Sequence, residues 1–166
     1  MPGPPPVRAW LLLVALSLPI LALSIDANGV VVLLPTMARD LGMRSVAASS
    51  VITFASVAFA APLILISRVA TRVGPRLVLF VGVAAFGVSS AVCALAGEPW
   101  VLMGGRVLQG VASACCFATS LAAIDAVFDT ERLPIAVGIW GAIGGVGSAA
   151  GPLVASLIGN TWSWRV

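Results

Sequence analysis

The sequence predicts an all-α membrane protein with five transmembrane helices. Of its 166 residues, 60% are hydrophobic and only 9% are charged, whereas about 25% of the residues in soluble domains are charged. A soluble domain of this size has too little interior to bury that much apolar surface. Five apolar stretches also reach the length of about 20 residues that a helix needs to cross a bilayer. We therefore expect lipid to surround this chain.

The first predicted helix covers residues 10–35 and follows a short Pro-rich segment. We expect residues 1–9, which begin Met-Pro-Gly-Pro-Pro-Pro, to form a disordered cytoplasmic tail. A basic residue, the apolar run and the small residues Ala22 and Ser24 are also compatible with a cleaved secretory signal. However, the apolar run continues past Asp26, beyond the roughly 7–15 residues of a signal core. A retained helix is the favoured interpretation.

Four further apolar stretches follow, separated by short segments that carry the charged and turn residues. The predicted helices cover residues 46–66, 77–95, 100–128 and 133–158. The segments between helices contain Arg39-Asp40-Leu41-Gly42, residues 68–76, Gly97-Glu98-Pro99 and residues 129–132. Because every connection is short, successive helices should be antiparallel neighbours.

The fifth predicted helix is unusually rich in small residues. Gly141 and Gly145, and again Gly147 and Gly151, are four residues apart, a spacing that lets a second helix backbone approach closely. Pro152 lacks an amide hydrogen and should kink the helix. A kinked, closely packed helix suits a moving element, although the same pattern also suits static packing.

The arginine residues predict the orientation of the helices. Cytoplasmic loops carry an excess of basic residues, and a cytoplasmic N-terminus places five arginines inside, namely Arg8, Arg68, Arg72, Arg76 and Arg132. Three would then lie outside: Arg39, Arg44 and Arg165. We expect a multi-pass protein with its N-terminus in the cytoplasm. Arginine without lysine, with abundant Ala, Gly and Val, hints at a GC-rich bacterial genome and hence at a bacterial inner (plasma) membrane.

Two charged residues lie inside predicted membrane helices. Asp26 and Arg106 each interrupt an otherwise apolar stretch, and a charge deep in hydrocarbon costs about 2.5–3.5 kcal/mol on insertion scales. At 1.5 Å per residue, Asp26 lies roughly 14 Å and Arg106 roughly 9 Å below the outer surface. At such similar depths, an ion pair, direct or through Gln109, is plausible. Buried charges of this kind commonly mark a pathway for substrate or protons.

Arg106 begins a stripe of polar residues on one face of the fourth helix. Gln109, Ser113, Cys116 and Ser120 follow it at three- and four-residue spacing. Such a stripe faces protein or a water-filled cavity rather than lipid. For Ser113 and Ser120, simple helix–helix adhesion is the favoured explanation. We assign Asp26, Arg106, Gln109 and Ser113 to a proton or substrate pathway.

Several other classes of function are excluded. The chain has no His, its charge of +3 is spread singly, and no cluster of basic residues suits nucleic acid. We interpret Cys93, Cys115 and Cys116 as packing residues, with no metal site and no cofactor. Neither a nucleophile–base pair nor a metal-ligand spacing indicates an enzyme. Three acids near the end of the fourth helix form a charged loop that could pair with Arg72, Arg76 or Arg132; they are Asp125, Asp129 and Glu131.

Four segments resemble motifs of the major facilitator superfamily, most closely those of its fourteen-helix drug:proton antiporter branch. Residues 25–35 resemble the first-helix motif Leu-Asp-x-Thr-Ile-Val-Asn-Val-Ala-Leu-Pro, with Asp26 and Pro35 matched and Val31 in place of Asn. Residues 67–76 resemble Gly-x-Leu-Ala-Asp-Arg-x-Gly-Arg-Lys, with Thr71 in place of the acid and Pro75 in place of a basic residue.

The other two motifs lie in the last two helices. Residues 106–110 contain Arg-x-x-Gln-Gly intact. Residues 147–152 resemble the antiporter signature Gly-x-x-x-Gly-Pro-x-x-Gly-Gly, with Ala155-Ser156 at its final pair. Ser163-Trp164-Arg165 is similar to the stretch that leads this family into a sixth helix.

The resemblance implies a fold, a function and a set of moving parts. It implies an incomplete N-terminal half of a major facilitator fold, in which helices one and four occupy corresponding positions of inverted repeats. It implies proton-coupled efflux of small lipophilic, often cationic compounds by a larger transporter. Arg72, Gly74, Arg76, Gly110, Gly147, Gly151 and Pro152 match positions of its conformational motifs. Thr71 lacks the charge of the acid that latches the cytoplasmic side in the family.

In that mechanism Asp26 would gain and lose a proton. Desolvation favours the neutral acid, while Arg106 favours the carboxylate. The partners expected are a small-molecule substrate, protons, the bilayer and the missing remainder of the transporter. The alternative is a small membrane scaffold that binds a partner through its Gly-rich fifth helix, with Asp26 and Arg106 pairing across chains.

Overall fold

The computed structural model describes residues 7–161, and all the regular structure in that range is helical. Six helices follow one another: α1 (Val7–Asp40), α2 (Ser45–Ala60), α3 (Leu63–Val73), α4 (Pro75–Ala94), α5 (Pro99–Val127) and α6 (Leu133–Thr161). Helices α1, α4, α5 and α6 are each long and apolar enough to cross a membrane. Helices α2 and α3 pass the same test together and make a fifth span, bent by 42°. The five predicted spans are therefore present when the bent pair counts as one.

The second span differs from its prediction. Residues 46–66 were expected to form one helix, but α2 ends at Ala60 and α3 begins at Leu63. Pro62 lies in the break, where its missing amide hydrogen and its ring disfavour a regular helix. Helix α3 then extends to Val73. Arg68 and Arg72, expected in a loop, instead lie exposed on this helix.

The first helix is longer than predicted at both ends. It begins at Val7, so residues 7–9 belong to a helix rather than to the expected tail, and residues 1–6 lie outside the described range. It continues through Pro35 to Asp40. The helix ends before Gly42, which has φ of +60°, and the Met43 amide donates to the Ala38 carbonyl at 2.8 Å. A glycine in this conformation is a common helix terminator.

The predicted connection over residues 68–76 shrinks to a single glycine. Gly74 separates α3 from α4 with φ of +100° and ψ of 132°. Side chains disfavour this backbone conformation, whereas glycine adopts it without a steric penalty. Pro75 follows at the first position of α4, where the absence of an amide hydrogen costs nothing.

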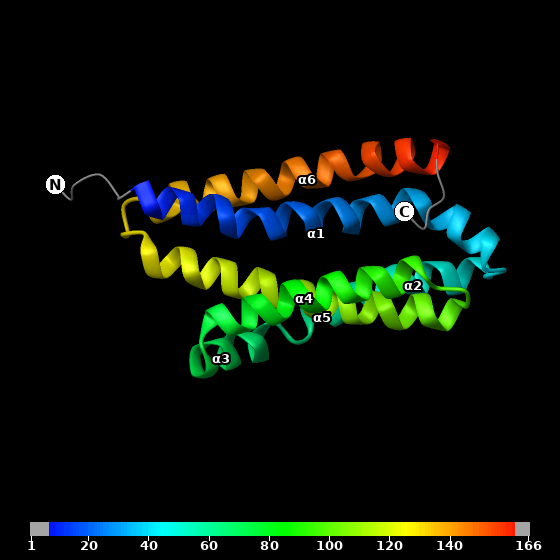
Figure 1. The fold of residues 1–166 in the computed structure, drawn as a ribbon, viewed down its shortest axis with the longest axis horizontal. Coiled ribbons are helices and arrows are strands. Elements are labelled where there is room, and N and C mark those ends of the chain that lie inside the picture. Colours follow the sequence, from blue (N-terminus) through cyan, green and yellow to red (C-terminus); the bar gives the residue numbers. More distant parts are fainter. Residues whose placement is uncertain (1–6, 162–166) are drawn as a thin grey trace.

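The helices pack in two groups, which lie one above the other in Figure 1. Helix α1 packs along α6, and α5 packs against α4 and α2. A Cβ atom on Gly147 would lie 2.7 Å from the Leu21 carbonyl oxygen, and one on Gly151 equally close to that of Ile25. Close approach of the two backbones thus requires glycine at both positions.

The other predicted glycine pair makes no such contact. A Cβ on Gly141 or Gly145 would meet no atom of the described residues within 4 Å. The prediction of close packing is wrong for this pair within the chain. Gly145 and Gly147 are two residues apart, which is a rotation of about 200° around the helix axis. They therefore lie on nearly opposite faces of α6, and only the face with Gly147 contacts α1. Helix α6 passes through Pro152 without a break in its helical structure.

Candidate functional site

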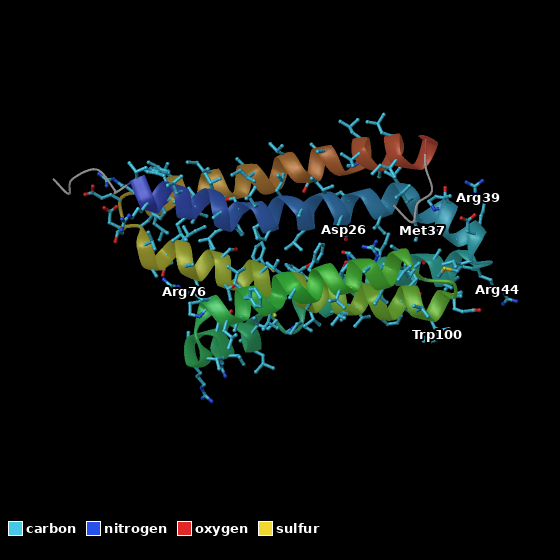
Figure 2. All side chains as sticks on the ribbon, in the orientation of Figure 1. Asp26, Met37, Arg39, Arg44, Arg76 and Trp100 are labelled. Carbon is cyan, nitrogen blue, oxygen red and sulfur yellow. The ribbon has the colours of Figure 1, made fainter. Side chains whose placement is uncertain are left out.

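The two charged side chains of the membrane helices form an ion pair. The Arg106 guanidinium donates from Nη1 to Asp26 Oδ2 at 2.7 Å. Arg106 is 7% exposed, while the Asp26 side chain retains 29% of its accessible surface. The ion pair expected from their similar depths is therefore present, and it joins α1 to α5. Figure 2 shows Asp26 on the side of α1 that faces the second group of helices.

Gln109 extends this pair to a third helix. Its amide nitrogen donates to Ser90 Oγ on α4 at 2.7 Å and lies 3.4 Å from Asp26 Oδ1. The Cys93 thiol lies 4.0 Å from the Gln109 side-chain oxygen. The network is incomplete, because the buried Arg106 Nε has no hydrogen-bond partner among residues 7–161. A buried polar atom without a partner is costly, so this site holds unused hydrogen-bonding capacity.

The ion pair lines a cavity of about 330 Å³ between α1, α2 and α5. Most of its wall is apolar and includes the rings of Phe59 and Phe117, whose centroids lie 5.6 Å apart. Ser24, Asn28, Ser56 and Ser113 add polar groups. A mainly apolar cavity with a few polar groups and one ion pair has the composition of a small-molecule site.

The polar stripe on α5 divides between two environments. Arg106, Gln109 and Ser113 line the cavity, and the Ser113 hydroxyl donates to the Gln109 carbonyl at 2.7 Å. Cys116 instead packs against Gly82 of α4, and Ser120 is fully buried, with its hydroxyl on the Phe117 carbonyl. The helix–helix explanation therefore holds for Cys116 and Ser120. Arg106, Gln109 and Ser113 instead face a cavity.

The predicted conformational residues lie in three places. Arg72, Gly74 and Arg76 are gathered around the α3–α4 turn, with both arginines exposed. Gly110 lies at the contact of α5 with α2, where a Cβ atom would collide with the Ala55 carbonyl oxygen. Gly147, Gly151 and Pro152 lie on α6, and the two glycines pack against α1.

Sequence reasoning missed two members of the polar network. Ser90 was not singled out, and Cys93 was interpreted only as a packing residue, yet both contact Gln109. Ser90 and Cys93 are three residues apart, and this spacing places them on one face of a helix. That spacing was the feature of the sequence that could have indicated a shared polar contact. That signal is weak, because serine and cysteine occur frequently at ordinary helix contacts.

The loop acids and the cysteines add no second site. Asp129 and Arg132 form an exposed ion pair of 3.8 Å, as one of the expected pairings. The three cysteines are free thiols. Within residues 7–161 the structure contains no group of three or more potential ligands placed to hold a metal ion.

Five membrane spans, with a partly buried ion pair on the wall of a mainly apolar cavity, define a class: multi-pass membrane proteins with an internal polar site. The chain belongs to the Major Facilitator Superfamily, whose family profile matches residues 16–166. It is 37% identical over 164 residues to the puromycin resistance protein pur8 of Streptomyces alboniger. It is 32% identical over 160 residues to the multidrug efflux pump LfrA of Mycolicibacterium smegmatis. It is 29% identical over 158 residues to a tetracenomycin C resistance and export protein of Streptomyces glaucescens.

These matches cover nearly all of this chain but a minor part of each relative. They include 98%, 96% and 95% of the chain, against 32%, 32% and 29% of the three relatives. The chain thus spans about a third of the length of the relatives it matches. Within it, Asp26 and Arg106 pair with each other, and Gly147 and Gly151 pack on α1. The scaffold alternative is not favoured, because it needs these groups for contacts between chains.

Proposed function

We propose that this chain forms the N-terminal part of a transporter that exports drugs or other small lipophilic compounds in exchange for protons. The observation that carries the proposal is the Asp26–Arg106 ion pair on the wall of an otherwise apolar cavity. The three relatives are named as resistance, efflux or export proteins. The chain alone would form only one wall of a transport pathway, and the remainder of the transporter would supply the other.

The cavity favours lipophilic substrates, including cations. Phe59 and Phe117 offer aromatic surface, and Asp26 offers a negative charge that remains partly accessible. An organic cation would gain from both features, since aromatic faces and carboxylates each attract positive charge. Such a ligand would compete with Arg106 for the Asp26 carboxylate.

That competition supplies a mechanism for coupling. When a proton binds the Asp26 carboxylate, the charge of the ion pair changes from balanced to +1 and the attraction to Arg106 falls. The α1–α5 contact would then loosen. A change of protonation would thus alter a contact between the two groups of helices, and Gln109 and Ser113 would be the neighbouring groups that respond.

The arginines support an orientation with the N-terminus in the cytoplasm and a location in the bacterial inner membrane. Figure 2 shows Arg76 towards one end of the bundle, and Arg39 and Arg44 at the opposite end. The end that carries Arg68, Arg72 and Arg76 would be the inner one. There, the α3–α4 turn would move with the opening and closing of the inner side, while Gly110, Gly147, Gly151 and Pro152 let helices slide at close range.

The test is proton-coupled efflux by the full-length gene product in a drug-susceptible bacterial host. Everted membrane vesicles should accumulate a fluorescent lipophilic cation when a pH gradient is imposed. Asp26→Asn should abolish this uptake, whereas Asp125→Asn, at an exposed acid of α5 outside the cavity, should leave it unchanged. Unaltered gradient-driven uptake by Asp26→Asn would contradict the proposal.

A further inference from the structure

Helix α3 and the start of α4 carry three exposed arginines. Arg68 and Arg72 are four residues apart and share one face of α3, and Arg76 is the second residue of α4. None of the three side chains is paired with an acid within residues 7–161. Helix α3 has no acid of its own. Three positive charges therefore lie at one end of the bundle without a neutralising partner in that range.

The level of these arginines in the bilayer follows from the length of α4. Its 20 residues span about 30 Å, which matches the thickness of the hydrocarbon core. Its first residue, Pro75, therefore lies at one edge of the hydrocarbon. Only Gly74 separates α3 from α4, so the last turn of α3 lies at the same edge. Arg68 is about 8 Å farther along the helix axis, and its long side chain can extend back to the edge.

The exposed residues of both helices change from charged to apolar with distance from that edge. The first turn of α3, which is its deepest part, exposes Ile64 by 73% and Leu65 by 64%. On α4, Leu77 and Phe80 lie just inside Arg76 and are 54% and 73% exposed. Helices α3 and α4 contact each other, and Figure 1 shows them at the same end of the bundle. Their shared end thus offers cations at the level of the headgroups and apolar side chains below them.

We propose that this end of α3 and α4 binds an anionic phospholipid, with its phosphate at the three arginines and its acyl chains along the exposed apolar residues. The inference goes beyond the proposed function and rests only on the proposed location in a bacterial membrane. A phospholipid carries its phosphate and its acyl chains in the same order along the membrane normal. Guanidinium groups bind phosphate oxygens through paired hydrogen bonds, and basic residues beside membrane helices attract anionic lipids.

An acidic segment from the remainder of the transporter is the other candidate occupant of this surface. Such a segment would have to bring carboxylates to the edge of the hydrocarbon, where burying charge is costly. The phosphate of a lipid already lies at that level. A lipid also covers the apolar residues of α3 and α4 with its own chains. The observations therefore favour the lipid.

The test measures the lipid preference of the full-length protein purified in detergent. Short-chain phosphatidylglycerol should bind at least about tenfold more tightly than phosphatidylcholine of equal chain length, because each arginine near the headgroups adds attraction for a net negative lipid. Arg68→Gln/Arg72→Gln/Arg76→Gln should remove most of this preference. The corresponding triple substitution to lysine should retain much of it, because the charges remain. Native mass spectrometry of the lipid-bound species measures both affinities.

Arg39 and Arg44 provide the matched control. They are exposed arginines at the opposite end of the bundle from Arg76, and Asp40 lies beside Arg39 in the sequence. Arg39→Gln/Arg44→Gln should leave the preference unchanged. Equal binding of the two lipids would overturn the proposal, as would an undiminished preference in the triple glutamine variant. Displacement of the lipid by an equal concentration of inorganic phosphate would also overturn it, because the arginines would then bind free phosphate.

The same measurements separate this inference from the proposed function. Lipid binding in detergent requires neither export nor a particular orientation of the chain. Loss of Asp26-dependent uptake with a preserved lipid preference would contradict the proposed function alone. Intact uptake without a lipid preference would overturn this inference alone, and a lower melting temperature of the triple glutamine variant would then assign the arginines to a protein contact.

Discussion

Arg106 Nη1 lies 2.7 Å from Asp26 Oδ2, and this contact joins two groups of helices that otherwise pack mainly within themselves. Helix α1 belongs with α6, and α5 belongs with α2 and α4. A single charge-assisted hydrogen bond therefore lies where the groups meet, with Gln109 and Ser90 extending it to α4. Whatever alters the charge on Asp26 acts directly on the relation between the groups.

Breaking the ion pair from one side should destabilise the protein more than removing it altogether. Loss of one member of a fully buried ion pair costs about 3–5 kcal/mol of stability. Because the Asp26 side chain is 29% exposed, the cost of Arg106→Gln should lie near or below the lower end of that range. The double variant Asp26→Asn/Arg106→Gln should recover part of that loss, because it leaves no unpaired charge. Thermal unfolding of the detergent-purified variants measures this, and strictly additive effects would argue against the pair.

The hydrogen bond between Gln109 and Ser90 should be measurable as a coupling energy. A double-mutant cycle of Ser90→Ala and Gln109→Leu should give about 0.5–1.5 kcal/mol. Ser89 provides the control, because its hydroxyl donates to the Phe86 carbonyl within α4, and Ser89→Ala should show no coupling to Gln109. Equal coupling for both serines would show that the effect is not specific to this bond.

Gly110 should tolerate no larger residue. A Cβ atom there would collide with the Ala55 carbonyl oxygen and lie 3.0 Å from the Ala58 Cβ, so Gly110→Ala should cost about 1–3 kcal/mol through overpacking. Gly104 lies on the same helix with nothing within 4 Å, and Gly104→Ala should be neutral or stabilising. The melting temperatures of the two variants should move apart; similar values would place α2 farther from α5.

Gly151 should likewise tolerate no larger residue, because it lies at the close contact between α1 and α6. Gly151→Ala would bring a methyl group to 2.7 Å from the Ile25 carbonyl oxygen, whereas Gly145→Ala meets open space. We expect Gly151→Ala to lower the yield of monodisperse protein in size-exclusion chromatography and Gly145→Ala to preserve it. A loss for Gly145→Ala alone would mean that α6 presents its other face to α1.

Gly74 should be required for its backbone conformation rather than for space. A Cβ atom added at Gly74 would meet no atom of the described residues within 4 Å, but the φ of +100° is unfavourable for any residue with a side chain. Gly74→Ala should therefore destabilise the protein by about 1–3 kcal/mol. Gly87→Ala, with equal space and no positive φ, is the control. Equal melting temperatures for these two variants would show that the α3–α4 turn can adopt another conformation.

Much of the fold was predictable because membrane insertion leaves a strong signal in composition. Long apolar runs and short connections indicated five spans, and the depths of Asp26 and Arg106 indicated their pairing. The predicted helix bounds were wrong where a single residue changes the backbone within a long apolar stretch or its connection. Pro62 lies where the second span divides, and Gly74 alone replaces the expected loop. Hydropathy averaged over a window does not register such single positions.

By itself, the sequence determined that this protein lies in a membrane and that one acid and one base share a level of the bilayer. The expectation that successive helices are neighbours is met closely by α4 and α5, but α1 packs mainly on α6, and α2 packs mainly on α5. Only the tertiary structure decided which glycine pair contacts α1, that Ser90 and Cys93 complete the polar network, and that Asp26 lines a cavity. The physical reason is that composition and periodicity report on solvent and on helix faces. Which faces meet depends on how all the helices pack together.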